Sequence, residues 1–238
     1  MNAHGAILDA QGVRALFQEL SDRLNTRGLH AQLFVVGGAA MALAYDQDRL
    51  TRDVDALFVP APVVREIAEE ISTAHGLEPD WLNDAAKGFL PGDDAHPVTV
   101  FESETLLVQV PSAEYLLAMK LHASRDERDL DDAATLFNRL GYSTAQDCID
   151  LLTDTYPAPQ LLPRHRYIAE DVAQRAEALR TSQDSAPSQK IVQPMHREVP
   201  PPGRGHASGR HRPPSGFFPG PESPAHHDRP SGPSAPSL

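Results

Sequence analysis

The sequence contains almost no cysteine and no long apolar run. Cys148 is the only cysteine in 238 residues, and a single cysteine cannot form an intramolecular disulfide, which favours a reducing compartment. No stretch approaches the roughly 18 apolar residues that cross a bilayer. No apolar stretch follows a basic start, as it would in a secretory signal. We therefore expect a cytoplasmic protein with no membrane partner.

The chain also lacks an excess of basic residues. It has 21 Lys and Arg against 33 Asp and Glu, a formal net charge of −12. Proteins that coat nucleic acid present a positive surface, so we expect no DNA partner, although a local basic groove is compatible with this balance. The hydrophobic fraction of 40% is sufficient for a folded core.

The composition changes abruptly near Thr181. From there to Leu238, 28 of 58 residues are Pro, Gly or Ser. Such a segment cannot bury enough apolar surface to offset its chain entropy. We predict a disordered tail over residues 181–238, an α/β core over residues 1–110, and a helical subdomain over residues 111–180 that completes the same folded unit.

Apolar periodicity in the body predicts strands first and helices afterwards. The expected strands lie at 33–36, 54–59, 98–101 and 106–110, and the last two form a hairpin. After Ser112 the pattern is helical throughout, and Ser143 with Gln146 is the expected capping box of one helix. This order is typical of an α/β (α+β) fold with a small sheet and a C-terminal helical half.

Two short motifs suggest a phosphate and metal site. Gly37-Gly38 lies between the first strand and a helix, where glycines let backbone N–H groups approach a phosphate. Asp53 and Asp55 are two residues apart at the start of the second strand, so both carboxylates share one face. Such a pair suits Mg²⁺ (or Mn²⁺) bridging triphosphate oxygens. Val54 and Leu57 are expected to point into the core.

Further residues nearby in the sequence and on the later helices are candidates for the same site. Arg49 and Thr51 precede the carboxylate pair and can meet phosphate or orient the acids. Lys120 lies on an otherwise apolar helix, where burial requires an anionic partner. Asp129 and Asp132 share a helical face. A structural Lys120–Asp132 pair and a triphosphate-binding Lys120 carry equal weight at this point.

Each motif also has an ordinary structural explanation. A Gly-Gly pair after an apolar strand is common in doubly wound folds, and a lone Asp-x-Asp is more often a solvated strand edge. The combined pattern of strand, Gly-Gly, helix, Arg-x-Thr-x-Asp-x-Asp and strand favours a functional site.

This combination resembles the nucleotidyltransferase (polymerase-beta-like) superfamily. Arg49-x-Thr51-x-Asp53-x-Asp55 is similar to the abortive-infection nucleotidyltransferase toxins of type IV toxin–antitoxin systems. The helical Lys120 and the acidic run at 125–132 also resemble that group. An uncharacterised nucleotidyltransferase-like bacterial family has the same layout over residues 10–175. The resemblance implies a small mixed sheet of the nucleotidyltransferase type.

The resemblance also implies an activity and a set of roles. It implies a Mg-dependent, ATP- or other NTP-binding transferase that acts on tRNA or a protein, with a cognate antitoxin as a further partner. The implied catalytic residues are Asp53, Asp55, Lys120 and Asp132, and Asp53 and Asp55 would hold the metal. The implied nucleotide-binding residues are Gly37, Gly38, Arg49, Thr51 and Lys120.

One departure from the superfamily pattern supports a rival hypothesis. Many members place a third carboxylate on a later strand, where this chain has Gln109. An amide cannot activate an attacking hydroxyl as a base. A non-catalytic domain of the same fold that binds a nucleotide or a partner is therefore the main alternative. A Rossmann-like binder of another phosphate ligand, with no role for Asp53 and Asp55, is a third.

The composition break generates a first testable prediction. A chain that ends at Thr181 should unfold cooperatively, with a melting temperature close to that of the full-length chain, because the residues removed cannot contribute a core. Thermal melts followed by circular dichroism test this. A large fall in the melting temperature would mean that the removed segment packs on the body.

Overall fold

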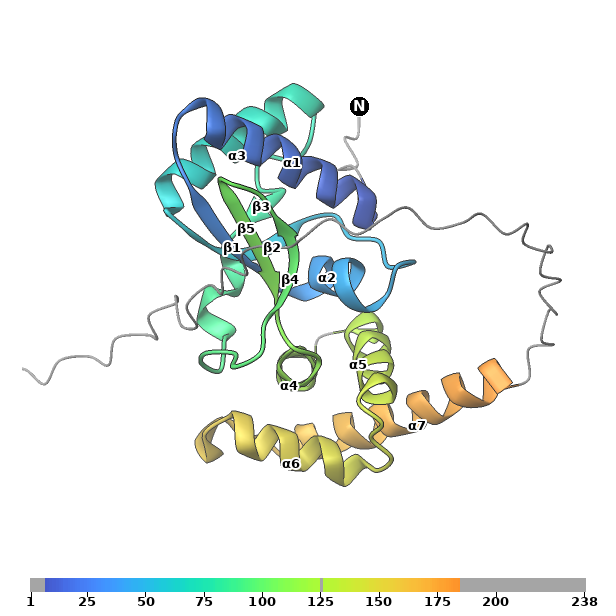
Figure 1. Ribbon diagram of the computed structural model, residues 1–238. Helices are drawn as coiled ribbons and strands as arrows, with labels where there is room; N and C mark the ends of the chain where they lie inside the picture. Colours follow the sequence, from blue (N-terminus) through green and yellow to red (C-terminus); the bar gives the residue numbers. More distant parts are fainter. Residues whose placement is uncertain (1–6, 125, 185–238) are drawn as a thin grey trace, which may run out of the picture. The chain divides into compact units, whose positions relative to one another are not determined.

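The computed structural model describes residues 7–124 and 126–184, and these residues form an α/β fold with a helical C-terminal half (Figure 1). The first half contains α1 (Ala10–Thr26), β1 (Ala31–Val35), α2 (Gly37–Ala40), η1 (Met41–Tyr45), β2 (Val54–Val59), α3 (Ala61–His75), β3 (Leu82–Asn83), η2 (Ala85–Phe89), β4 (Val98–Glu102) and β5 (Leu106–Val110). The second half contains α4 (Ala113–Ala123), α5 (Glu127–Arg139), α6 (Ala145–Thr155), η3 (Ala158–Gln160) and α7 (Arg164–Asp184).

The five strands form one mixed sheet in the order β3-β2-β1-β5-β4. The central strand β1 runs parallel to β5 and antiparallel to β2, and β4 pairs with β5 as the expected hairpin. The side chains of Leu33, Ala56, Phe58 and Val108 are buried on one face. Their alternation with less buried neighbours is what a sheet with one covered face requires.

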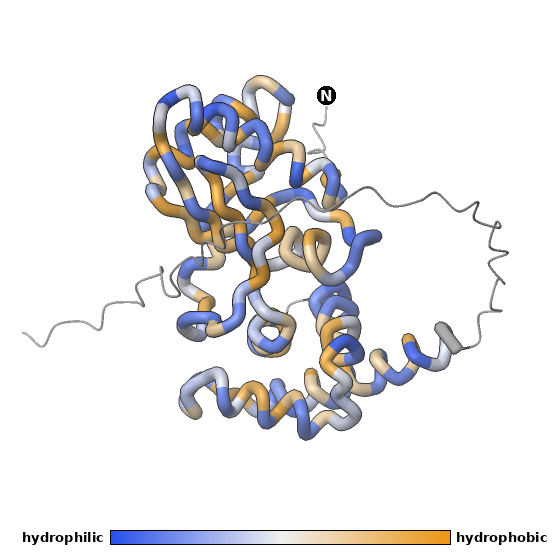
Figure 2. The backbone as a smooth tube through the Cα atoms, in the orientation of Figure 1, coloured by the Kyte–Doolittle hydropathy of each residue, from blue (hydrophilic) through white to orange (hydrophobic). Residues whose placement is uncertain are grey.

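The core runs from this sheet into the helical half. Figure 2 shows hydrophobic residues concentrated along the strands and recurring along the helices. Phe137 of α5 is fully buried, and α5 packs along α7. The predicted mixed α/β fold with a helical back half is therefore confirmed. α7 continues to Asp184, and the rest of the expected tail lies outside the described residues.

One local expectation is wrong. Ser143 and Gln146 do not form the capping box of α6, because Thr144 is the N-cap and Asp147 supplies the reciprocal carboxylate. The box is shifted by one residue along the chain. Both the predicted and the observed pair have the Ser/Thr-x-x-acceptor spacing, so the spacing alone could not distinguish them.

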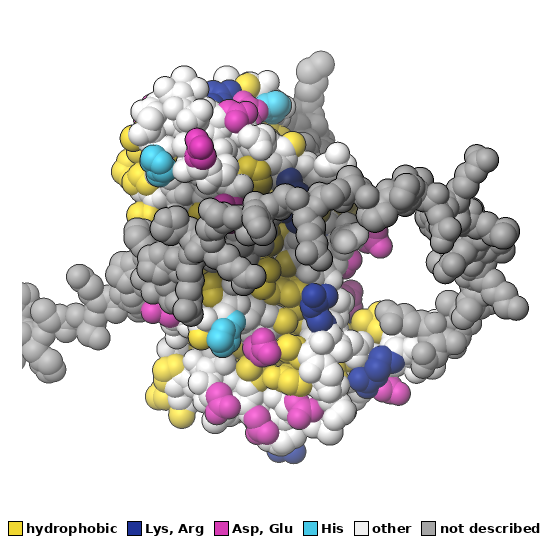
Figure 3. All heavy atoms as spheres, viewed as in Figure 1, with side chains coloured by type: hydrophobic (Ala, Val, Ile, Leu, Met, Phe, Trp, Pro, Cys, Tyr) yellow, Lys and Arg dark blue, Asp and Glu magenta, His cyan; other side chains and the backbone are white. Residues whose placement is uncertain are grey.

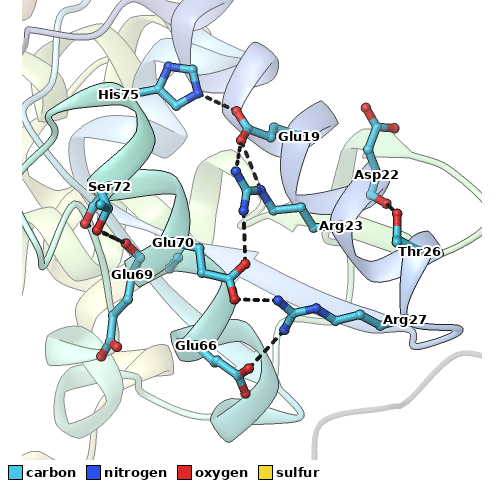
Figure 4. Close-up of polar contacts among 12 residues, drawn as sticks. Glu19, Asp22, Arg23, Thr26, Arg27, Glu66, Glu69, Glu70, Ser72 and His75 are labelled. Atoms are coloured by element: carbon cyan, nitrogen blue, oxygen red, sulfur yellow. Dashed lines mark hydrogen bonds and ion pairs between the residues drawn. The ribbon is translucent and has the colours of Figure 1, made fainter.

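A line of ion pairs connects α1 to α3 (Figure 4). Arg23 binds Glu19 and Glu70, and Arg27 binds Glu70 and Glu66. Each exposed pair of this kind contributes about 0–1 kcal/mol, so the line aligns the two helices more than it stabilises them. The same carboxylates neutralise the guanidinium groups of Arg23 and Arg27, so these two cations are already paired.

Among the described helices, none is both long enough and apolar enough to cross a bilayer.

A buried histidine lies where α4, α6 and α7 meet. The His165 side chain is buried, and its Nδ1 accepts a hydrogen bond from the Leu162 N–H at 3.1 Å. The His122 ring lies 5.0 Å from it, centroid to centroid, and stacks on Tyr156 at 4.0 Å. Burial lowers the pKa of His165, and the nearby His122 and Arg164 lower it further. The folded chain therefore holds His165 neutral.

This depressed pKa predicts a loss of stability in mild acid. The unfolded chain takes up a proton at an ordinary histidine pKa of about 6.5, whereas the folded chain resists it, so the free energy of unfolding should fall as the pH drops below that value. His165→Asn should reduce this pH dependence, and the exposed His96→Asn should leave it intact. Urea unfolding at pH 7.5 and pH 5.5 measures the difference. Equal pH dependence in all three proteins would contradict the assignment.

Candidate functional site

Gly37 and Gly38, which follow β1 and begin α2, form a glycine turn. This turn lies close to the side chains of Asp55 in β2 and of Thr51 in the loop before it. Gly37 has φ +66°, a left-handed conformation that favours glycine. A Cβ at Gly37 would lie 3.1 Å from Oδ2 of Asp55, and a Cβ at Gly38 would lie 3.2 Å from Oγ1 of Thr51. Side chains at either position would crowd these oxygens. The two glycines therefore allow the turn to approach the carboxylate closely.

The two aspartates of the predicted pair differ in exposure. Asp53 is exposed just before β2, whereas Asp55 is half-buried as the second residue of that strand. The Val36 N–H donates to the Asp55 carbonyl at 2.8 Å, which joins the turn to the strand. The buried Thr51 donates from Oγ1 to the Asp53 carbonyl at 2.9 Å. This hydrogen bond from Thr51 thus holds the backbone at Asp53 in place.

The chemistry of the donors fits a divalent cation that is shared with a substrate. In the described residues, no group of three or more His, Cys, Asp or Glu side chains is placed to hold a metal alone. Mg²⁺ usually takes one or two carboxylates and completes its shell with phosphate oxygens and water. Asp53 and Asp55 would hold the ion under those conditions, and the triphosphate would supply the remaining ligands.

The face of the sheet that carries Asp55 also carries Leu57 and Gln109. Phe34 pairs with Leu57 on one side and with Gln109 on the other, so the three side chains lie on one face. The expectation that Leu57 points into the core opposite Asp55 is wrong, because positions 55 and 57 share a face in a period-two strand. The Gln109 amide donates to Thr99 Oγ1 at 3.4 Å. An amide therefore lies on the carboxylate face, as the sequence indicated.

A cluster of four charged side chains connects this region to the helical half. Arg49 donates from Nε to Asp132 Oδ1 at 2.8 Å and from Nη2 to Asp132 Oδ2 at 3.2 Å. Lys120 donates from Nζ to Asp132 Oδ2 at 2.7 Å and to Asp129 Oδ1 at 2.8 Å. Lys120 and Asp132 are buried. The hydrogen bond to Asp132 is the main cause that raises the pKa of Arg49.

The structure thus contains the Lys120–Asp132 ion pair that was one of the two expectations for this lysine. It also brings together half of the predicted site residues at the turn, namely Gly37, Gly38, Thr51 and Asp55. What sequence reasoning missed is the Arg49–Asp132 ion pair. The two residues are 83 positions apart, and no local spacing in a single sequence relates them.

A separate hollow lies between the loop at 91–95, the start of α4 and the end of α6. Its acidic lining residues are Asp93, Asp94, Glu114 and Asp154, and no Lys or Arg is among the described residues that line it. Figure 3 shows acidic side chains on the described surface in this view. A triphosphate would be repelled there, so the Gly37–Asp55 region is the better candidate site.

One protein-family model matches the chain. A family described as nucleotidyltransferase of unknown function (DUF6036) matches residues 11–143 of the chain. The matched range spans the glycine turn, the Asp53–Asp55 pair and the Lys120–Asp132 ion pair. Comparisons with curated proteins and with solved structures gave no match.

The buried ion pairs generate a stability prediction. Lys120→Met keeps the aliphatic stem but leaves Asp129 and Asp132 without that cation, so the free energy of unfolding should fall by about 3 kcal/mol. Arg65→Met is the matched control, because the Arg65–Asp84 pair is half-exposed and such pairs contribute about 0–1 kcal/mol. Urea unfolding measures both. A Lys120→Met protein as stable as the control would contradict a structural role for these contacts.

Proposed function

Because the chain belongs to this family of nucleotidyltransferases, we propose that it transfers a nucleoside monophosphate from an NTP to an acceptor hydroxyl, with Mg²⁺ or Mn²⁺ as cofactor. The observation that carries the proposal is the Asp55 carboxylate against the Gly37 turn, where the Cβ position lies 3.1 Å from Oδ2. A carboxylate beside a glycine turn suits a metal–triphosphate complex, because each component meets a group of opposite charge or a backbone donor.

The reaction requires positioning and charge neutralisation more than covalent chemistry by the protein. The acceptor oxygen bonds to the α-phosphorus, the bond between that phosphorus and the α–β bridging oxygen breaks, and pyrophosphate leaves with the electron pair. The bound cation would neutralise charge on the phosphates. Gly37, Gly38 and Thr51 form the cradle, and the region of Arg49 and Lys120 supplies positive charge.

The proton of the acceptor hydroxyl needs a destination. Gln109 cannot take it, because a neutral amide is not a base in this pH range. In the proposed reaction the proton therefore passes to water or to a carboxylate of the Asp53–Asp55 pair.

The proposed acceptor is tRNA or a protein side chain, and the proposed setting is the cytoplasm, as one component of a toxin–antitoxin or phage-defence pair with a cognate antitoxin. This part of the proposal rests on the resemblance of the Arg-x-Thr-x-Asp-x-Asp motif. Incubation with each radiolabelled NTP, Mg²⁺ and either total tRNA or lysate protein tests it. Label on RNA, label on protein and no label distinguish the acceptors from an inactive protein.

A second candidate function is a non-catalytic domain that binds a nucleotide or a partner. Gln109 on the face of Asp55 favours it, because the position that many relatives fill with a carboxylate is an amide. The two candidates differ in label transfer: the non-catalytic domain binds without transferring label under any acceptor condition.

The carboxylate pair generates a binding prediction. Asp53→Ala combined with Asp55→Ala should abolish Mg²⁺-dependent NTP binding while the domain stays folded, because both metal ligands are lost and neither side chain is fully buried. Titration calorimetry with and without Mg²⁺ measures the binding, and a thermal melt checks folding. Asp150→Ala with Asp154→Ala, two exposed positions on α6, makes the same change in charge and should bind normally. Unchanged affinity in the first double variant would argue against the metal site.

A further inference from the structure

Arg49 lies against the second glycine of the turn. The Cβ position of Gly38 is 3.6 Å from the Nη2 nitrogen of Arg49. The side chain of Arg49 is 18% exposed, so the guanidinium is enclosed but still reachable. The guanidinium of Arg49 thus lies beside Gly38, and the carboxylate of Asp55 lies beside Gly37.

The guanidinium is anchored through all three of its nitrogens. Nε and Nη2 bind the two oxygens of Asp132, and Nη1 donates to the Leu50 carbonyl at 2.6 Å. A guanidinium has five N–H groups, and these contacts use three of them. One N–H on Nη1 and one on Nη2 have no acceptor among the described residues. Because the guanidinium is planar and held at three N–H groups, its two remaining N–H groups point in fixed directions.

Lys120 in turn holds the carboxylate of Asp132 in place. Its side chain is 5% exposed, and Lys120 binds it at 2.7 Å while also binding Asp129 at 2.8 Å. The charges alternate from Asp129 through Lys120 and Asp132 to Arg49. Lys120 offsets the negative charge of Asp132, so Arg49 retains its attraction for an anion. Two of the three N–H groups of Lys120 already donate to carboxylates.

We propose that Arg49 is the cation that contacts the triphosphate at the glycine turn, and that Asp132 is a positioning residue that aims it, with Lys120 keeping Asp132 in place; this division of roles rests on the proposed function. Asp132 then acts only through Arg49. It neither touches the nucleotide nor exchanges a proton with it, because both of its oxygens accept from cations. Lys120 acts one step further from the substrate.

The test uses inorganic triphosphate with Mg²⁺ as the probe, since it carries the charge of every NTP without a base. Arg49→Ala and Arg49→Lys should each weaken binding about tenfold to a hundredfold, the range for a charge-assisted hydrogen bond. Arg49→Lys keeps the charge but cannot hold Asp132 with a fork and reach a phosphate as well. Arg52→Ala removes an exposed cation three residues away and should change affinity less than about threefold, consistent with a screened surface charge.

The positioning role of Asp132 is tested by a double-variant cycle. Asp132→Asn should weaken binding in the wild-type chain and have no further effect on binding in the Arg49→Ala chain, because its influence passes through Arg49. Its effect on the melting temperature should persist in both backgrounds. If the role of Asp132 is purely structural, Asp132→Asn should lower the melting temperature and should weaken binding in the Arg49→Ala chain as well as in the wild-type chain.

The outcomes separate this inference from the proposed function. If the wild-type chain does not bind magnesium triphosphate at all, both fail. If it binds, and loses binding with the Asp53 and Asp55 double variant but not with either Arg49 variant, the role of Arg49 is wrong while the metal site stands. If Asp132→Asn weakens binding equally with and without Arg49, Asp132 does not act through Arg49.

Discussion

The carboxylate of Asp132 is the contact on which the geometry of the candidate site depends. It lies on α5 in the helical half, yet it accepts hydrogen bonds from Arg49, in the loop before β2, and from Lys120 on α4. A buried carboxylate is costly unless cations and hydrogen bonds compensate it, and here two cations do so. The same contact therefore joins three segments and fixes the loop that carries Thr51 and leads into Asp53. The helical half is part of the site because it supplies this anchor.

The glycine turn packs against that fixed loop. Gly37 and Gly38 have no side chains to separate the turn from Asp55, Thr51 and Arg49, and the close approach leaves a small region bounded by a carboxylate, a hydroxyl and a guanidinium. Groups of opposite charge beside two adjacent glycines suit a ligand that carries a metal ion at one end and anionic oxygens along its length. The acidic hollow near α6 has only one sign of charge in its described lining. This difference in electrostatic character, more than size, favours the turn as the binding site.

The face of the sheet that carries Asp55 is where this chain departs from the wider superfamily pattern. Asp55, Leu57, Phe34 and Gln109 share that face, and Gln109 holds the position where a carboxylate would provide a base. The Asp53–Asp55 pair and the glycine turn match the pattern, whereas an amide lies at the position of the third acid. In the proposed reaction the proton of the acceptor hydroxyl therefore passes to water or to the pair itself.

Local patterns in the sequence determined the fold class, the hairpin, the glycine turn and the carboxylate pair, because periodicity, turn residues and short spacings are properties of neighbouring residues. The same period of two places Leu57 on the face of Asp55, so the expectation that Leu57 points into the core was wrong. Only the tertiary structure decided the pairing of Arg49 with Asp132 and the choice of Asp129 as a second partner of Lys120. These contacts depend on how α4 and α5 pack beside the loop before β2. A single sequence contains no signal for that arrangement, since charged residues 83 positions apart have many partners available until the core brings two of them together.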